Sequence, residues 1–228
     1  MNVSVALAAY NGEKYISQQI DSILSQLSLD DELVISLDPS TDQTLNIIQS
    51  YNDPRIKVIK GPGKGLIKNF ENAIVHTSKE IIFLSDQDDV WKENKIETVL
   101  KAFDDNTLLV VHDAIVVDES LKEIHSSFFS ICHSKTGIVK NIIKNSYIGC
   151  CMAFRKELIE QIIPFPKSLP MHDQYIGLMA EKKGKSKFIN EKLIYYRRHD
   201  TNASNNKHAS ILQMLVWRIQ IIQAYIRG

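Results

Sequence analysis

Residues 81–89 read IIFLSDQDD, a short apolar run that ends in a cluster of carboxylates. An apolar run of this length predicts a strand that is buried on both faces. Three similar segments precede it, at residues 3–8, 32–37 and 55–60. Segments with apolar residues at helical spacing separate them. Strands that alternate with helices predict an α/β fold with a parallel sheet and right-handed crossovers.

Polar residues follow each of the four predicted strands. They lie at residues 9–11, at Asp38, at residues 61–63 and at residues 86–89. Ligands of parallel sheets bind beyond the carboxyl ends of the strands. We therefore expect these four segments to gather along one edge of the sheet and to form a binding site there.

The acidic segment favours a metal site. Asp86 and Asp88 would share one face of a strand, because strand side chains alternate. Two like charges about 4 Å apart repel by a few kcal/mol at an effective dielectric near 20, and a divalent cation would reverse that effect. Mg²⁺ and Mn²⁺ prefer oxygen ligands and often share them with substrate phosphates. The alternative is an acidic turn that caps the helix predicted around residues 95–99.

The second half of the chain is less regular. We expect a strand over residues 108–117 that is interrupted at 112–113, and a strand with a glycine bend over residues 146–154. Further expected elements are a short helix over 156–163, a helix from 171 to 180, a strand over 188–197, a polar loop over 200–207 and a long helix over 209–227.

Three segments resemble the signatures of family-2 glycosyltransferases with the GT-A fold, which transfer a sugar from a nucleoside diphosphate. Residues 3–12 (VSVALAAYNG) resemble the opening strand and Tyr-Asn turn, residues 37–44 (LDPSTDQT) the DDGSTD signature, and residues 83–91 (FLSDQDDVW) the DxD strand. Looser matches at residues 149–154 and 172–173 extend the resemblance over most of the chain. Two positions depart from the pattern, since Ala9 precedes Tyr10 and Leu37 replaces the first Asp of the pair.

The resemblance implies a single GT-A domain over residues 1–228, with a Rossmann-like, mostly parallel sheet flanked by helices. Residues 1–112 would form a nucleotide-sugar-binding half and residues 113–204 an acceptor-binding half. Residues 205–228 would form a C-terminal helix.

The resemblance also implies roles for individual residues. The nucleotide-sugar would contact Ala8, Tyr10, Asp38, Lys64, Lys68, Asp86, Gly149 and His172. Asp88 would bind Mn²⁺ or Mg²⁺, with Asp86 and His199 as further metal ligands. Asp173 would deprotonate the acceptor hydroxyl as the sugar is transferred with inversion.

The implied reaction uses a UDP- or dTDP-sugar donor and a saccharide or lipid-linked acceptor in bacterial surface polysaccharide synthesis. The SDQDDVW form resembles bacterial rhamnosyltransferases, which implies dTDP-rhamnose as one candidate donor. Two alternatives stay open. One is a Mg²⁺-dependent phosphatase of the haloacid-dehalogenase type, although residues 8–10 supply no nucleophilic Asp after the first strand. The other is a nucleotide-sugar-binding module without turnover.

Composition limits the cellular setting. Lys plus Arg and Asp plus Glu number 27 each, which argues against a general nucleic-acid binder. No apolar run approaches the roughly 20 residues of a transmembrane helix, and the first residues lack a signal-peptide pattern. The three cysteines do not make a disulfide framework. We expect a cytoplasmic protein, with peripheral attachment to the inner face of the membrane as an alternative.

The last predicted helix is amphipathic. Its aliphatic residues recur at helical spacing between 211 and 226. Packing on its own domain is the first interpretation. The alternatives are a homodimer through this helix or contact with a membrane surface.

Overall fold

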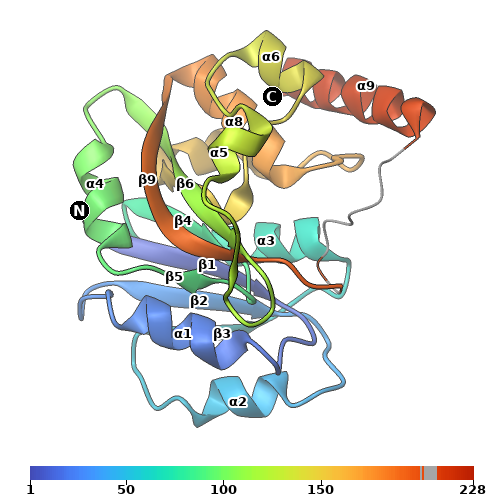
Figure 1. The fold of residues 1–228 in the computed structure, drawn as a ribbon. Helices are drawn as coiled ribbons and strands as arrows, with labels where there is room; N and C mark the ends of the chain where they lie inside the picture. The colour runs from blue at the N-terminus through green and yellow to red at the C-terminus, as the bar shows by residue number, and fades with distance from the viewer. Residues whose placement is uncertain (201, 203–209) are drawn as a thin grey trace.

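The computed structural model describes residues 1–200, 202 and 210–228. Its strands form one sheet in the order β3-β2-β1-β4-β8-β6-β9-β5, with β7 paired to β6. Helices pack on the sheet, and α9 lies at the outside of the molecule (Figure 1). The α/β fold that the sequence predicts is confirmed.

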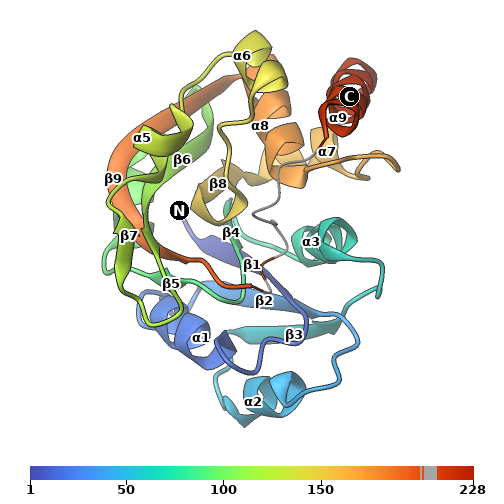
Figure 2. The same ribbon diagram turned by 45° about the vertical axis from the view of Figure 1, so that its right-hand side comes forward.

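The first half follows the predicted alternation. Its strands are β1 (Val3–Ala9), β2 (Glu32–Leu37), β3 (Ile56–Lys60) and β4 (Ile81–Ser85), and their pairings are all parallel. The helices between them are α1 (Ile16–Leu24), α2 (Thr44–Ser50) and α3 (Leu66–Val75). Every residue of β1 and β4 is buried, as continuous apolar strands at the centre of a sheet require. Because the strand order reverses at β1, α3 lies on the opposite face from α1 and α2 (Figure 2).

The second half extends the same sheet with mixed pairing. Strand β8 (Met152–Arg155) is antiparallel to both β4 and β6 (Thr107–Val117), and β9 (Lys185–Arg197) runs parallel to β6. Short strands β5 (Val90–Trp91) and β7 (Glu123–His125) complete it. The helices are α4 (Lys95–Ala102), α5 (Phe128–Cys132), α6 (Ile138–Ile143), α7 (Ile159–Ile162), α8 (His172–Lys183) and α9 (Ile211–Arg227), with 3₁₀ turns η1 (Gly149–Cys151) and η2 (Lys156–Leu158).

The predicted interruption at residues 112–113 is wrong. Strand β6 continues through both residues, with register shifts against β9 beside them. The carboxylate of Asp113 is buried but accepts hydrogen bonds from Ala114 N, Phe129 N and Ser127 Oγ. A polar side chain whose hydrogen bonds are all made can occupy a buried strand. For this reason Asp113 does not end β6.

The predicted strand over residues 146–154 is also corrected. Residues 149–151 form η1, and only residues 152–155 are a strand. The loop predicted over 200–207 lies almost entirely outside the described residues, and the terminal helix is seen from Ile211 onward. In the described part of the chain, no helix has the length and apolar content needed to cross a membrane.

Candidate active site

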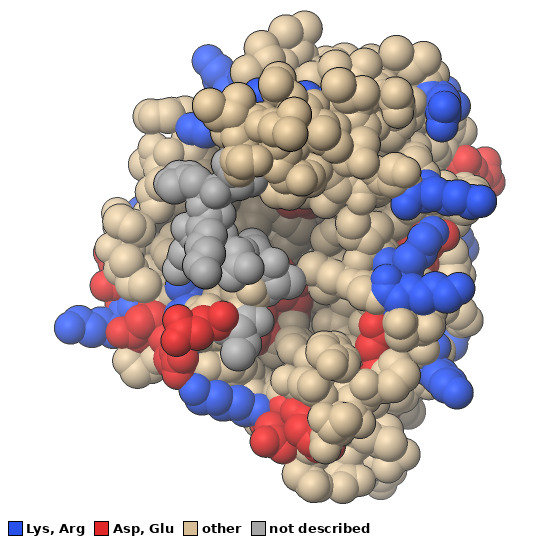
Figure 3. Space-filling model, turned by 90° about the vertical axis from the view of Figure 1, so that its right-hand side faces the viewer, with Lys and Arg blue, Asp and Glu red and all other residues tan. Residues whose placement is uncertain are grey.

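A cavity of about 1070 Å³ lies beyond the carboxyl ends of β1, β2 and β4. Figure 3 shows this hollowed face, with acidic side chains visible inside it. The first half of the chain and the second half both line it. Predicted site residues on its wall are Ala8, Tyr10, Asp38, Asp86, Asp88, Gly149, His172, Asp173 and His199. The expected gathering of strand-end segments is therefore observed.

Asp38 lies on the wall directly after β2. Its backbone N–H donates to Ala9 O at 2.9 Å, and Gly63 N–H donates to its Oδ1 at 2.7 Å. A Cβ at Gly61 would fall 2.4 Å from the same oxygen, so the chain can pass this close to the carboxylate only because residue 61 is glycine. The aspartate is 5% exposed, and one of its oxygens is held in place.

Tyr10 lines the cavity and is 54% exposed. Its backbone is held by Gln87, the middle residue of the DxD segment. Tyr10 N–H donates to Gln87 Oε1 at 2.9 Å, and Gln87 Nε2 donates to Tyr10 O at 2.8 Å. Sequence reasoning missed this role, because the pattern gives no signal for the middle position.

The acidic residues do not share one strand face. Strand β4 ends at Ser85, so residues 86–89 form a turn and the expected alternation does not apply. Asp88 points to the end of β9, where its Oδ2 lies 2.8 Å from His199 Nε2 and accepts from Asn202 Nδ2 at 3.1 Å. Asp89 is fully buried and accepts from Arg197 N at 2.9 Å. The turn therefore sends its carboxylates in different directions.

Burial, together with the crowding of like charges, raises the pKa values of Asp86 and Asp89 in this turn. Burial, followed by the charges of Asp88, Asp89 and Asp173, raises the pKa of Asp86 well above its usual range. Burial and the charge of Asp88 raise the pKa of Asp89 to about 7. Excess negative charge of this kind favours a cation. Carboxylates from Asp86 and Asp88 with the imidazole of His199 make a donor set that suits Mn²⁺.

The alternative in which the acidic turn caps α4 finds no support. Ile96 N–H, in the first turn of that helix, donates instead to Gln26 Oε1 at 3.4 Å. Asn94 precedes the helix in the left-handed region, and its side chain makes no capping bond. Residues 86–89 therefore face the cavity and the sheet rather than the helix terminus.

Asp173 and His172 begin α8 on the opposite wall. Asp173 Oδ1 accepts from Gln174 N at 2.6 Å, and burial raises the pKa of Asp173 to about 6. The His172 ring stacks on Phe70 with centroids 4.4 Å apart. Burial lowers the pKa of His172 to about 4, and its buried Nε2 has no hydrogen-bond partner among the described residues. A Cβ at Gly149 would lie 3.2 Å from that nitrogen, so glycine leaves room for the imidazole.

Lys64 and Lys68 do not line the cavity. Lys64 is exposed, and Lys68 forms an ion pair with Glu71 one helical turn away. Because α3 carries both the lysine and its partner, the ammonium is held along the helix and not over the cavity.

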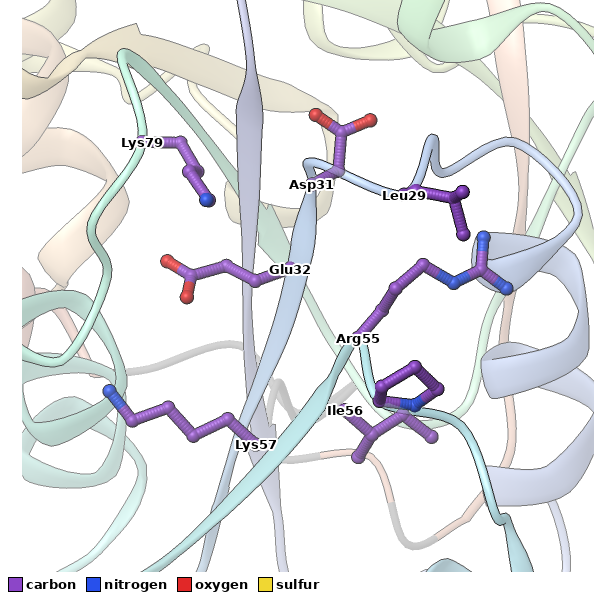
Figure 4. A pocket seen from close by; sticks show the side chains of 8 residues that line it. Leu29, Asp31, Glu32, Arg55, Ile56, Lys57 and Lys79 are labelled. Carbon is purple, nitrogen blue, oxygen red and sulfur yellow. The ribbon is translucent and has the colours of Figure 1, made fainter.

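A second, smaller cavity of about 480 Å³ lies at the opposite end of β2 and β3 (Figure 4). Two of its charged groups, Glu32 and Arg55, already have partners. Glu32 accepts from Ser4 Oγ and Ser78 N, and the Arg55 guanidinium pairs with Asp53. The cavity at the carboxyl ends of the strands is therefore the candidate active site.

Solved structures share the fold. The chain aligns with residues 1–349 of Staphylococcus aureus TarS in complex with UDP-GlcNAc at a TM-score of 0.74 and 20% identity, covering 97% of this chain and 66% of that one. A mannosyltransferase from Pyrobaculum calidifontis, solved with GDP-Man and Mn²⁺, aligns at a TM-score of 0.66 and 18% identity, with coverage of 99% and 64%. These similarities define the fold as GT-A-like.

Sequence comparison gives the family. Residues 4–163 match the model of Glycosyl transferase family 2, and the chain belongs to that family. A Nostoc glycosyltransferase is 28% identical over 213 residues, which cover 89% of this chain and 66% of the relative. The dTDP-rhamnosyl transferase RfbG of Shigella flexneri is 24% identical, with coverage of 86% and 72%. The β-1,3-glucosyltransferase WfgD of Escherichia coli, which uses UDP-Glc, is 27% identical, with coverage of 90% and 80%. The chain thus spans less than two thirds of the Nostoc relative's length.

Proposed function

We propose that this protein is an inverting, metal-dependent glycosyltransferase that moves a sugar from a nucleoside diphosphate to an acceptor hydroxyl. The observation that carries the proposal is the placement of Asp38, Asp88 and Asp173 around one cavity. In this assignment residues 1–112 bind the nucleotide-sugar and residues 113–204 bind the acceptor, while the terminal segment 205–228 contains the helix α9 (Ile211–Arg227).

Tyr10 and Asp38 would bind the base. The exposed Tyr10 ring offers a flat apolar surface on which a pyrimidine can stack. The Asp38 carboxylate has one oxygen held by Gly63, and its other oxygen would accept the imide N–H of uracil or thymine. Ala8 beside them is 4% exposed and leaves space at the floor of the cavity.

Asp88, His199 and Asp86 would hold Mn²⁺ or Mg²⁺ against the diphosphate. When bound, the ion would act as a Lewis acid for the charge that develops on the leaving diphosphate. The protein itself contributes the orientation of the metal-binding side chains. His199 Nε2 and Asp88 Oδ2 already lie 2.8 Å apart, so a β9-end residue and a β4-end residue converge.

Asp173 would take the proton of the acceptor hydroxyl. A base works best when its pKa approaches the operating pH, and burial brings the pKa of Asp173 to about 6. The group is therefore mostly ionised at neutral pH. Proton transfer must accompany attack at the anomeric carbon, because a carboxylate is too weak to form a free alkoxide. His172, neutral at this pH, would donate or accept a hydrogen bond at a sugar or phosphate oxygen.

A UDP- or dTDP-sugar is the proposed donor, and dTDP-rhamnose is one candidate. The dTDP-rhamnosyl transferase and UDP-Glc transferase among the relatives support this range. The proposed acceptor is a saccharide or a lipid-linked saccharide of bacterial surface polysaccharide synthesis. Lys64 and Lys68 would reach the donor only after leaving their present positions.

The phosphatase alternative is weakened by β1, which ends without a carboxylate at Ala9. The binding-module alternative differs from the enzyme only in turnover. Measuring sugar transfer separates the two. If the wild-type protein transfers sugar and Asp173→Asn does not, the protein is an enzyme, because a binding module needs no base.

Thermal unfolding with Mn²⁺ and a panel of UDP, dTDP and GDP tests the donor site. A ligand at 100 times its dissociation constant adds about 2.7 kcal/mol of stability. We expect a pyrimidine diphosphate to raise the melting temperature, and Asp88→Asn to reduce that rise. No response to either pyrimidine diphosphate would contradict the proposed function.

A further inference from the structure

Arg197, the last residue of β9, is a buried cation beside the candidate active site. It is 4% exposed and does not line the cavity. None of the ion pairs among the described residues involves it. A guanidinium that is buried without a carboxylate partner is costly, so its hydrogen bonds have to compensate for the water that it loses.

The guanidinium connects three segments that are distant in the sequence. Its Nε donates to Asp88 O at 2.8 Å, in the acidic turn that follows β4. Its Nη1 donates to Glu119 O at 2.7 Å, in the turn between β6 and β7. Its Nη2 donates to Gln18 Oε1 at 2.5 Å, in α1. Because the donors of a guanidinium lie in one plane with fixed spacing, these three bonds fix the three segments relative to one another.

The same side chain also reaches the second proposed metal ligand, through the ring of Tyr15. The guanidinium carbon of Arg197 lies 4.7 Å from the centroid of that ring. The His199 imidazole packs on the ring as well, with centroids 4.8 Å apart. Tyr15 is only 8% exposed, so the ring has little freedom to move. Asp88 and His199, whose Oδ2 and Nε2 atoms lie 2.8 Å apart, are therefore both connected to Arg197.

A second arginine makes similar contacts far from the site. Arg155, at the end of β8, donates from Nε to Thr107 O at 3.0 Å and from Nη2 to Asp104 O at 3.1 Å. Its guanidinium carbon lies 5.5 Å from the centroid of the Phe103 ring. Arg155 pairs with Ile81, the first residue of β4, so it provides a matched comparison at the end of the sheet opposite the cavity.

We propose that Arg197 is a positioning residue for the proposed metal site. It holds the backbone of Asp88 and, through Tyr15, the imidazole of His199, so that the two side chains converge. This inference rests on the proposed function. The useful property of Arg197 is its planar set of donors and not its positive charge, which by itself would weaken the binding of a cation. A lysine in its place keeps the charge but not the three directed bonds.

Mn²⁺ binding, measured by the loss of the free-ion EPR signal with and without saturating UDP, tests this role. Arg197→Lys keeps the charge and removes the planar set of donors. We expect it to bind Mn²⁺ about 10- to 100-fold more weakly than wild type, the usual effect of losing a group that orients metal ligands. Arg155→Lys makes the same change at the opposite end of the sheet and should stay within about twofold of wild type.

Urea unfolding in the absence of metal separates positioning from packing. Each lysine variant loses bonds to two backbone carbonyls, so both should be less stable than wild type. Only Arg197→Lys should also lose Mn²⁺ affinity. A loss of Mn²⁺ affinity of the same size in both variants would show that lower stability is the cause, and would refute the positioning role.

The outcomes distinguish this inference from the proposed function. If wild-type protein binds no Mn²⁺ with or without UDP, the proposed function fails and this inference fails with it. If wild type binds Mn²⁺ and Arg197→Lys binds it equally well, the role of Arg197 alone is refuted.

A milder variant keeps the proposal testable if Arg197→Lys does not fold. Gln18→Leu removes the acceptor of Nη2 at an exposed position that does not line the cavity. We expect it to weaken Mn²⁺ binding about threefold, at the scale of one lost hydrogen bond. Wild-type Mn²⁺ affinity in Gln18→Leu would then overturn the proposal.

Discussion

Two adjacent residues of α8 respond to the same surroundings in opposite ways. Burial raises the pKa of Asp173 to about 6 and lowers that of His172 to about 4. Loss of hydration disfavours the charged form of each group, which is the carboxylate in one and the imidazolium in the other. Near neutral pH the wall of the cavity therefore holds one carboxylate that can take a proton and one neutral imidazole.

Asp173→Asn removes the proposed base while it keeps the shape of the side chain. We expect transfer to fall by 10² to 10⁴-fold, the usual contribution of general base catalysis. Binding of a pyrimidine diphosphate should stay within about twofold of wild type, because the base acts on the acceptor. Steady-state transfer rates and nucleotide titration measure the two effects. Unchanged transfer would remove Asp173 from the mechanism.

The same carboxyl predicts a pH profile. The proton must be off Asp173 for it to act as base, so kcat/KM should rise with pH and level off above its pKa of about 6. Because burial raises this pKa, the rise in kcat/KM should occur at a higher pH than for an ordinary aspartate, whose pKa is near 3.9. Initial rates from pH 4.5 to 8 at saturating Mn²⁺ would trace it. A flat profile across pH 5–7 would contradict the assignment.

At the level of elements, α8 holds Asp173 through close packing on Tyr147. A Cβ at Gly177, inside α8, would lie 2.4 Å from ring atoms of Tyr147. That ring is buried, and its hydroxyl donates to Glu181, so it cannot easily move. Gly177→Ala should therefore destabilise the protein by about 1–3 kcal/mol, as overpacking does. Urea unfolding measures it.

Gly149→Ala is the matched comparison. Its Cβ would approach His172 Nε2 at 3.2 Å, and a shift of a few tenths of an ångström in the imidazole would relieve the contact. We expect wild-type stability within about 0.5 kcal/mol. Equal destabilisation by the two alanines would show that the close contact with the Tyr147 ring is not the cause.

Sequence patterns predicted the first half of the fold well, because its strands are apolar throughout and its helices recur between them. The second half was harder, since Asp113 is satisfied by partners distant in the sequence. The same holds for the site. Residues at strand ends were found from topology alone, whereas the role of Gln87 depends on contacts with the Tyr10 backbone that no local pattern encodes.

For the whole molecule, the main unexplained surface is α9. Ile221 and Ala224 are buried, so the expected packing on the domain involves only a narrow stripe. Exposed apolar residues continue from α9 onto α6, namely Ile211, Leu212, Leu215, Ile219, Ile226, Val139 and Ile143. Residues 134–147 and 210–228 contain five Lys or Arg (Lys135, Lys140, Lys144, Arg218 and Arg227) and no Asp or Glu. Apolar and cationic residues without acids suit an anionic lipid surface.

We therefore expect binding to vesicles that contain anionic phospholipid, measured by co-sedimentation, and weaker binding to neutral vesicles. Replacing Ile211, Leu215 and Ile219 together by Glu should abolish binding without changing nucleotide affinity. Sedimentation velocity in the absence of lipid provides the other outcome. A dimer that the triple substitution dissociates would assign this face to a second copy of the chain.

The reciprocal bonds between Gln87 and Tyr10 connect the turn of the proposed metal ligands with the proposed base-binding residue. Gln87 lies between Asp86 and Asp88, the proposed metal ligands, and its side chain hydrogen-bonds to the backbone of Tyr10. In the proposed site, this one amide would therefore fix the distance between the nucleobase and the diphosphate. Gln87→Ala should weaken nucleotide binding about tenfold, at the scale of two lost hydrogen bonds, while Mn²⁺ affinity stays unchanged. Separate calorimetric titrations with UDP and with Mn²⁺ would measure the two affinities, and an unchanged UDP affinity would contradict this role of Gln87.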